Sequence, residues 1–236
     1  MGAMSHRSTT LRCFSPPVMV ATFVIEIGLA IWTLWRYRHT RLVQLVAVIL
    51  VCLAIFQLAE FTICENMFGL SGITWARIGY LAITALPALG IHALTYIAKR
   101  PARWLVLSSY AAMAAFMVYF GFVGHGITAA TCGGNYVIFE TNSAATLWYA
   151  YYYYGLELIA LLAAAYFAKR SSDTRTKHAL YGLTGAYLTL IVPVATVNII
   201  NRQLIHAVPS IMCGFAVFLA LIVALYVLPR AAEPKH

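Results

Sequence analysis

Apolar residues run through this chain in seven long stretches, and charged residues gather in the short segments between them. Each stretch has roughly the 20 residues that an α-helix needs to cross a bilayer. The apolar character is continuous rather than alternating, which favours helices over the strands of a membrane barrel. The predicted spans are residues 18–35, 42–64, 73–97, 104–123, 145–168, 179–200 and 207–228. We therefore expect an all-α integral membrane bundle that forms a single domain over residues 1–236.

The composition supports lipid as the solvent of this fold. Of the 236 residues, 62% are apolar and 10% are charged, whereas a soluble domain carries about 25% charged residues. Packing in water cannot hide so much apolar surface, so the lipid bilayer is an expected partner. A nucleic-acid partner is not expected, because it would need a large basic domain for which the seven spans leave no room.

The basic residues are distributed unequally between the two ends of the predicted helices. Twelve of the sixteen fall on the first, third and fifth connections and the carboxy-terminal tail: Arg36, Arg38, Arg41, Lys99, Arg100, Arg103, Lys169, Arg170, Arg175, Lys177, Arg230 and Lys235. The other end has Arg7, Arg12, Arg77 and Arg202. The positive-inside rule then predicts an outer amino terminus and a cytoplasmic carboxy terminus, in a multi-pass protein of the inner (plasma) membrane. The net charge of +9 would reflect this topology and a weak attraction to anionic lipid.

Three carboxylic acids interrupt the apolar spans. Glu26, Glu60 and Glu157 fall in the first, second and fifth spans. A charge in the middle of a bilayer costs about 2.5–3.5 kcal/mol even on the translocon scale. Each carboxyl group is therefore expected to face the interior of the bundle, where it finds a partner or stays protonated.

Helical spacing collects polar residues on two faces. Gln57, Glu60 and Cys64 recur at intervals of three and four, and Tyr153 precedes Glu157 by four, so each set lies on one side of its helix. We predict a ligand-binding cavity open to the outside and lined by Gln57, Glu60, Arg77, Tyr153, Glu157 and Asn198. The alternative interpretation is that these side chains form hydrogen bonds between helices and fix their packing.

The longest predicted connection, residues 124–143, lies on the outer side and includes Cys132. It could cover the outer mouth of the bundle or form an irregular solvated loop. A disulfide between Cys64 and Cys132 would tie the outer end of the second span to this connection. Such a bond is chemically allowed if that side is oxidising.

Several activities lack the residues that they require. A covalently bound retinal needs a lysine within the seventh span, but the lysines are Lys99, Lys169, Lys177 and Lys235. The sequence contains no GxSxG, HExxH or Walker motif. His92 is the one histidine deep inside a span, which is more typical of a hydrogen-bonded core residue than of a haem or metal ligand. We therefore expect no enzymatic activity, no metal and no other cofactor.

The third span and its flanks read Trp75-Ala76-Arg77-Ile78-Gly79-Tyr80, Leu86-Pro87 and Thr95-Tyr96. Together with Glu60, the basic segment Arg175-Thr176-Lys177-His178 and Asn198, this resembles the seven-transmembrane amino-terminal sensor region of bacterial histidine kinases and diguanylate cyclases. The resemblance implies signal reception among the helices. In that family an output domain usually follows the seventh helix, whereas eight residues remain here. Either the chain is truncated or it signals through a separate partner.

The function expected from the sequence is a receptor-like sensor that binds an unknown small ligand and signals to a separate cytoplasmic protein. Two other classes stay open. A small proton-coupled transporter would use Glu26, Glu60 and Glu157 as a relay, although no inverted repeat is visible. A non-catalytic accessory subunit of a membrane complex would keep a broad apolar face covered by a partner subunit.

Overall fold

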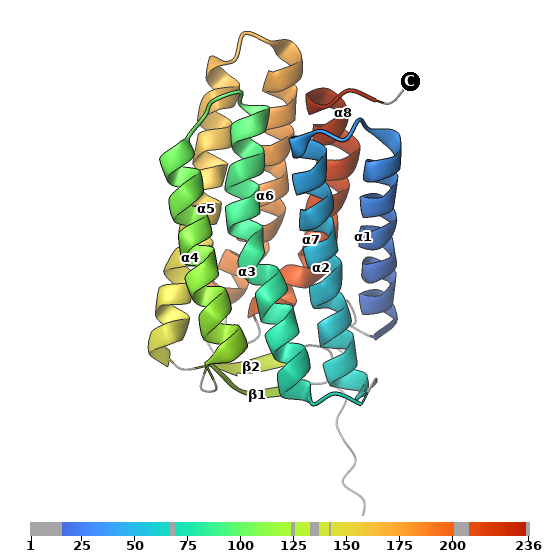
Figure 1. Cartoon of the computed structure of the whole chain (residues 1–236), viewed down its shortest axis with the longest axis vertical. Coiled ribbons are helices and arrows are strands. Elements are labelled where there is room, and N and C mark those ends of the chain that lie inside the picture. Colours follow the sequence, from blue (N-terminus) through green and yellow to red (C-terminus); the bar gives the residue numbers. More distant parts are fainter. Residues whose placement is uncertain are drawn as a thin grey trace, which may run out of the picture.

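The computed structural model describes residues 16–66, 69–123, 126–132, 137–141, 143–200 and 208–234. Within these ranges the chain folds into long helices that run up and down side by side (Figure 1). They are α1 (Pro16–Arg36), α2 (Arg41–Glu65), α3 (Gly72–Ile97), α4 (Arg103–Phe122), α5 (Ser143–Arg170), α6 (Thr174–Ile200) and α7 (Val208–Ile222). A π-helical turn, η3 (Val223–Val227), and the short α8 (Leu228–Ala231) continue α7.

Six of these helices are long and apolar enough to cross a membrane, which makes this a multi-pass membrane protein. They are α1, α2, α3, α4, α6 and the continuous helix from α7 to α8. The expected fifth span, α5, is not among them, although its 28 residues exceed the length needed. Its tyrosine-rich first half and Glu157 lower its mean hydropathy. The helix predicted there is present, and its crossing of the membrane stays a prediction.

Helix α3 lies at the centre of the packing. Helices that are adjacent in the sequence contact one another, and α7 returns to contact α1 and α2. In addition, α3 contacts α5 and α6, so it is largely buried, whereas α4 lies at the periphery. Polar side chains from helices on both sides of α3 therefore lie close to it in the interior of the bundle.

Side-chain caps decide where two of the helices begin. Thr40 accepts a hydrogen bond from the backbone N–H of Val43 at the start of α2. Asp173 accepts hydrogen bonds from the N–H of Arg175 and the hydroxyl of Thr176 at the start of α6. These contacts satisfy N–H groups that have no partner within a helix. As a result, α6 begins five residues before the predicted apolar span, which started at residue 179.

The connection predicted as an outer loop contains a β-hairpin. Strand β1 (Ile127–Cys132) pairs antiparallel with β2 (Val137–Thr141), and Cys132 lies opposite Val137. Ile127, Val137 and Phe139 are buried against the bundle. The interpretation of this segment as an irregular solvated loop is therefore wrong, because its alternate residues bury apolar side chains.

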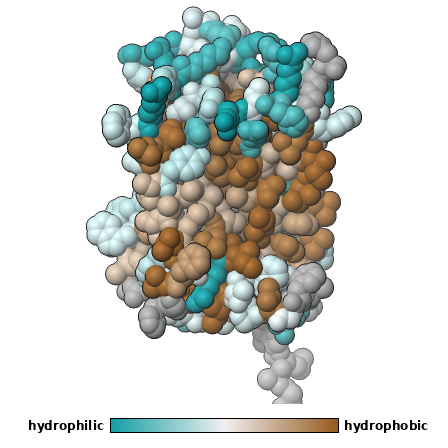
Figure 2. All heavy atoms as spheres, in the orientation of Figure 1, coloured by the Kyte–Doolittle hydropathy of each residue, from teal (hydrophilic) through white to brown (hydrophobic). Residues whose placement is uncertain are grey.

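Polar and apolar residues separate along the length of the bundle. Hydrophilic side chains gather at the end where α1–α2, α3–α4 and α5–α6 are connected, and hydrophobic ones cover the middle (Figure 2). The hairpin lies at the opposite end (Figure 1). We call these the basic end and the hairpin end.

Candidate functional site

The first helix pair carries two buried carboxyl groups. Glu26 on α1 is 0% exposed and Glu60 on α2 is 1% exposed. The two carboxyl groups lie within electrostatic range of each other. Neither oxygen of Glu26 has a hydrogen-bond partner among the described residues. Burial without a hydrogen-bond partner is costly for a carboxyl group, so Glu26 is an expensive residue at this position of α1.

The row of polar groups continues through tyrosines on α3 and α5. The Tyr80 hydroxyl lies within electrostatic range of Glu60 and of Tyr154. The Tyr80 ring centroid is 5.9 Å from that of Tyr149, and Tyr149 is hydrogen-bonded to the Thr84 hydroxyl at 3.2 Å. Tyr80 and Thr84 of α3 thus lie between Glu60 on α2 and Tyr149 on α5.

At the far side of the bundle, Glu157 on α5 is 4% exposed. The hydroxyl groups of Tyr154 and Tyr187 lie within electrostatic range of its carboxyl group. The Tyr187 hydroxyl packs so closely on Gly90 of α3 that a side chain at position 90 would collide with it. Gly90 thus provides the space that lets Tyr187 reach the interior.

We call these interior groups the acid–tyrosine row: Glu26, Glu60, Tyr80, Tyr149, Tyr154, Glu157 and Tyr187. The row joins five helices through groups that can bind or release protons and can donate or accept hydrogen bonds. The part of the chain that the structure describes contains no cluster of acidic, histidine and cysteine residues suited to a metal ion. The carboxyl and hydroxyl groups of the row offer hydrogen bonding and proton exchange.

The predicted cavity residues take different positions. Gln57, Glu60, Tyr153 and Glu157 are all buried, and the Tyr153 ring lies 5.7 Å from that of Tyr149. Arg77 on α3 is half-buried, and its Nε has no hydrogen-bond partner among the described residues.

Other predicted positions lie beyond what the structure describes. Asn198 belongs to α6, but its side chain is outside the described residues, as are Arg7, Arg12, Arg202 and Lys235.

Sequence reasoning missed Tyr80 as a member of the row. Its helix carries no stripe of acidic or amide side chains, so spacing within α3 gives no signal. His92, by contrast, is hydrogen-bonded as expected: its Nδ1 lies 3.0 Å from the Tyr110 hydroxyl. Its side chain is only half-buried, which differs from a core position.

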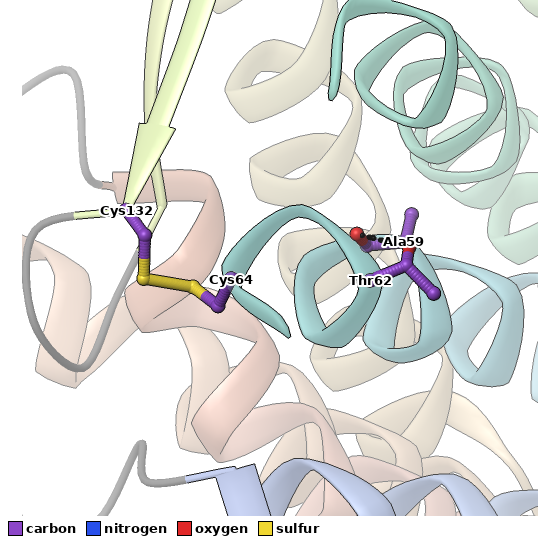
Figure 3. The surroundings of a disulfide bond; sticks show 4 residues. All are labelled: Ala59, Thr62, Cys64 and Cys132. Carbon is purple, nitrogen blue, oxygen red and sulfur yellow. Dashed lines mark hydrogen bonds between the residues drawn. A yellow bond between two sulfur atoms is a disulfide. The ribbon is translucent and has the colours of Figure 1, made fainter. Parts of the chain in front are cut away.

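A disulfide connects the hairpin to α2. Cys64 and Cys132 are bonded to each other, with their Cα atoms 5.2 Å apart (Figure 3). Phe139 of the same hairpin lies against Tyr80 and Phe56, at centroid distances of 5.2 and 5.9 Å. The hairpin therefore packs directly on Tyr80 of the acid–tyrosine row.

No protein-family profile matches this chain, and a search of curated proteins finds no similar sequence. The resemblance to bacterial sensor regions stays a prediction.

Proposed function

We propose that this protein is a receptor-like membrane sensor, and that a small ligand reaching the acid–tyrosine row from the hairpin end changes its helix packing. The single observation that carries the proposal is the set of three carboxyl groups buried among the helices. Acidic groups within membrane helices are expensive and usually serve a functional site. The alternative, hydrogen bonds that fix packing, agrees less well with Glu26, whose oxygens have no hydrogen-bond partner among the described residues.

The proposed orientation places the basic end in the cytoplasm and the hairpin end outside. Two independent features support it. Basic residues gather at cytoplasmic ends of membrane helices, and disulfides persist in oxidising compartments. Here the basic connections and the Cys64–Cys132 bond are at opposite ends of the bundle. In this orientation α5 also crosses the membrane, as the fifth of seven spans along the chain.

The proposed mechanism is a shift between two helix arrangements. A ligand that hydrogen-bonds to Glu60 or Glu157 in one arrangement only would favour that arrangement. The size of the shift is limited by the difference in its affinity for the two. Because α3 contacts helices on both sides of the row, movement of α3 would carry the change to the cytoplasmic end.

One observation favours a second candidate, a proton-coupled transporter. Glu26 and Glu60 are close enough for the charge of one to act on the other, and such a pair can share or pass a proton. A transporter would expose this pair alternately to the two sides of the membrane, whereas a sensor needs access from the outside alone.

Cysteine labelling tests both candidates. In a background with Cys13, Cys52 and Cys213 changed to serine, Gln57→Cys would be treated with a small, membrane-impermeant methanethiosulfonate in sealed vesicles of each orientation. Leu70→Cys, at an exposed position of the hairpin end, is the positive control. Leu50→Cys is the negative control, because Leu50 is fully buried two turns deeper on the same helix face.

The three outcomes separate the candidates. Modification of Gln57→Cys from the hairpin side alone supports the sensor. Modification from both sides favours the transporter. Protection from both sides, with Leu70→Cys reactive, would show that the row is sealed and that the proposal is wrong.

A further inference from the structure

A hollow of about 440 Å³ lies at the basic end of the bundle, far from the hairpin end. The last turns of α3, the connection 98–102 and the first turn of α4 form its walls. Three cationic side chains line it, those of Lys99, Arg100 and Arg103, and no carboxylate of the described residues does so. A fourth cation, Arg41, lies within electrostatic range of His92 on its wall.

One cation of the hollow, Lys99, has an acidic partner. Asp173 forms an ion pair with Lys99 at 3.6 Å, and both side chains are largely exposed to water. Exposed pairs of this kind are weak. Arg100 and Arg103 are also exposed, and their guanidinium groups have the planar geometry that binds the oxygens of a phosphate in pairs.

The backbone adds to the same positive potential. Arg103 is the first residue of α4, a helix of 20 residues, and Ala102 before it provides no side-chain cap. The N–H groups of a helix start attract anions, and here they adjoin a hollow that Ala102 and Arg103 line. The start of α4 therefore reinforces the binding of an anion that the three cations already favour.

The surroundings of the hollow indicate that the anion belongs to an amphiphile. Below it, along the outer face of α4, Trp104 is 84% exposed and Leu107 is 61% exposed. Helix α4 is one of the six candidate membrane spans, so this face meets lipid. Tryptophan at such a boundary marks the level of lipid headgroups. Val106 gives the hollow an apolar wall on the side where α4 packs on the core.

We propose that this hollow binds the phosphate group of an anionic phospholipid from the leaflet that meets the basic end. The phosphate oxygens accept hydrogen bonds from Arg100 and Arg103, with Lys99 as a further cation, and the acyl chains lie along α4. A soluble phosphate ester would use the same groups, and the experiment distinguishes the two sources. The site is separate from the acid–tyrosine row and does not depend on the function proposed for it.

The test compares two charge-matched double variants of the full chain in mild detergent. Arg100→Gln with Arg103→Gln removes two cations from the hollow. Arg38→Gln with Arg175→Gln removes two exposed cations from the same end but outside it. Native mass spectrometry measures the dissociation constant for dioleoylphosphatidylglycerol, with dioleoylphosphatidylcholine and inorganic phosphate as separate arms. Elution as a single species and an unchanged thermal midpoint show that each variant is folded.

For the first variant we expect phosphatidylglycerol binding to weaken roughly thirtyfold, since each cation near an anionic lipid contributes on the order of a fivefold gain. The second variant should change the dissociation constant for phosphatidylglycerol by less than about threefold. Arg100→Lys with Arg103→Lys should recover much of the affinity. Inorganic phosphate is the test of a soluble source. If it binds, and binds more weakly to the first variant, while neither lipid binds, then the hollow recognises the phosphate group of a soluble molecule. Equal losses in both double variants, or no loss in either, would show that the attraction is diffuse and overturn the site.

Discussion

The hydroxyl of Tyr152 on α5 donates a hydrogen bond to the backbone carbonyl of Thr84 on α3, at 2.7 Å. The bond is buried and joins residues 68 positions apart in the sequence. Thr84 lies three residues before Pro87, the proline within α3. The N–H that proline lacks would pair with the carbonyl of Ile83, so Tyr152 does not replace it. The Tyr152 bond instead joins α3 to α5 next to the interrupted turn.

Tyr152→Phe should lower the thermal midpoint of the protein in detergent. The ring and its packing are kept, so the loss is that of one interhelical hydrogen bond, about 0.5–1.5 kcal/mol. Tyr151→Phe is the matched control, because Tyr151 is 65% exposed on the same helix. Equal midpoints for the two variants would mean that the Tyr152 bond contributes no stability.

Glu26→Met should stabilise the fold. Methionine has a similar volume and removes a buried carboxyl group whose oxygens have no partner among the described residues. Relief of an unsatisfied polar group is worth about 1–3 kcal/mol. Denaturant or thermal unfolding measures the gain, and Glu65→Met, at an exposed carboxylate of α2, should change stability little. A destabilised Glu26→Met would contradict an uncompensated cost of burial at this carboxyl group.

Loss of the Cys64–Cys132 bond should destabilise the hairpin end. The bond closes a loop across a separation of 68 residues, for which the chain-entropy estimate is up to roughly 4 kcal/mol. Cys64→Ser with Cys132→Ser should lower the thermal midpoint and speed proteolysis of the hairpin. Cys52→Ser is the control, since the Cys52 thiol is free. A midpoint that does not respond to reduction in the unsubstituted protein would contradict a stabilising role.

Acid should weaken the start of α6. The hydrogen bond from the Thr176 hydroxyl lowers the pKa of Asp173, with further contributions from the Arg175 N–H and the charge of Lys99. A depressed pKa means that the unfolded state binds the proton more readily. The stabilising contribution is present above the ordinary pKa of an aspartate, about 4. It is lost as pH falls through the lower value of the folded state.

The matching experiment measures thermal midpoints at neutral pH and at progressively lower pH. Asp173→Asn keeps a capping side chain but does not titrate, so the decrease in midpoint between neutral pH and pH values below about 4 should become smaller. Glu65→Gln, at the opposite end of the bundle, should leave the decrease unchanged. An unaltered acid profile in Asp173→Asn would exclude the cap as its source.

Features that depend on a single segment of the chain could be predicted directly from the sequence. The apolar stretches predicted the helices closely, because a helix in lipid must satisfy its backbone internally and must have a minimum length. The burial of Glu26, Glu60 and Glu157 also followed, because a carboxyl group facing acyl chains is too costly. The start of α6 at Thr174 was missed because a cap, rather than apolar character, decides it.

Relationships between distant segments needed the folded chain. The sequence left the pairing of Cys64 and Cys132 open and could not show a hollow between α3 and α4. It also gave no sign that Tyr80 lies within electrostatic range of Glu60. The same holds for the β-hairpin, whose strands gain stability by burying Phe139 against other helices. Spacing along one helix tells which residues share a face. Which faces then meet is decided by how side chains from different helices fill the space between them.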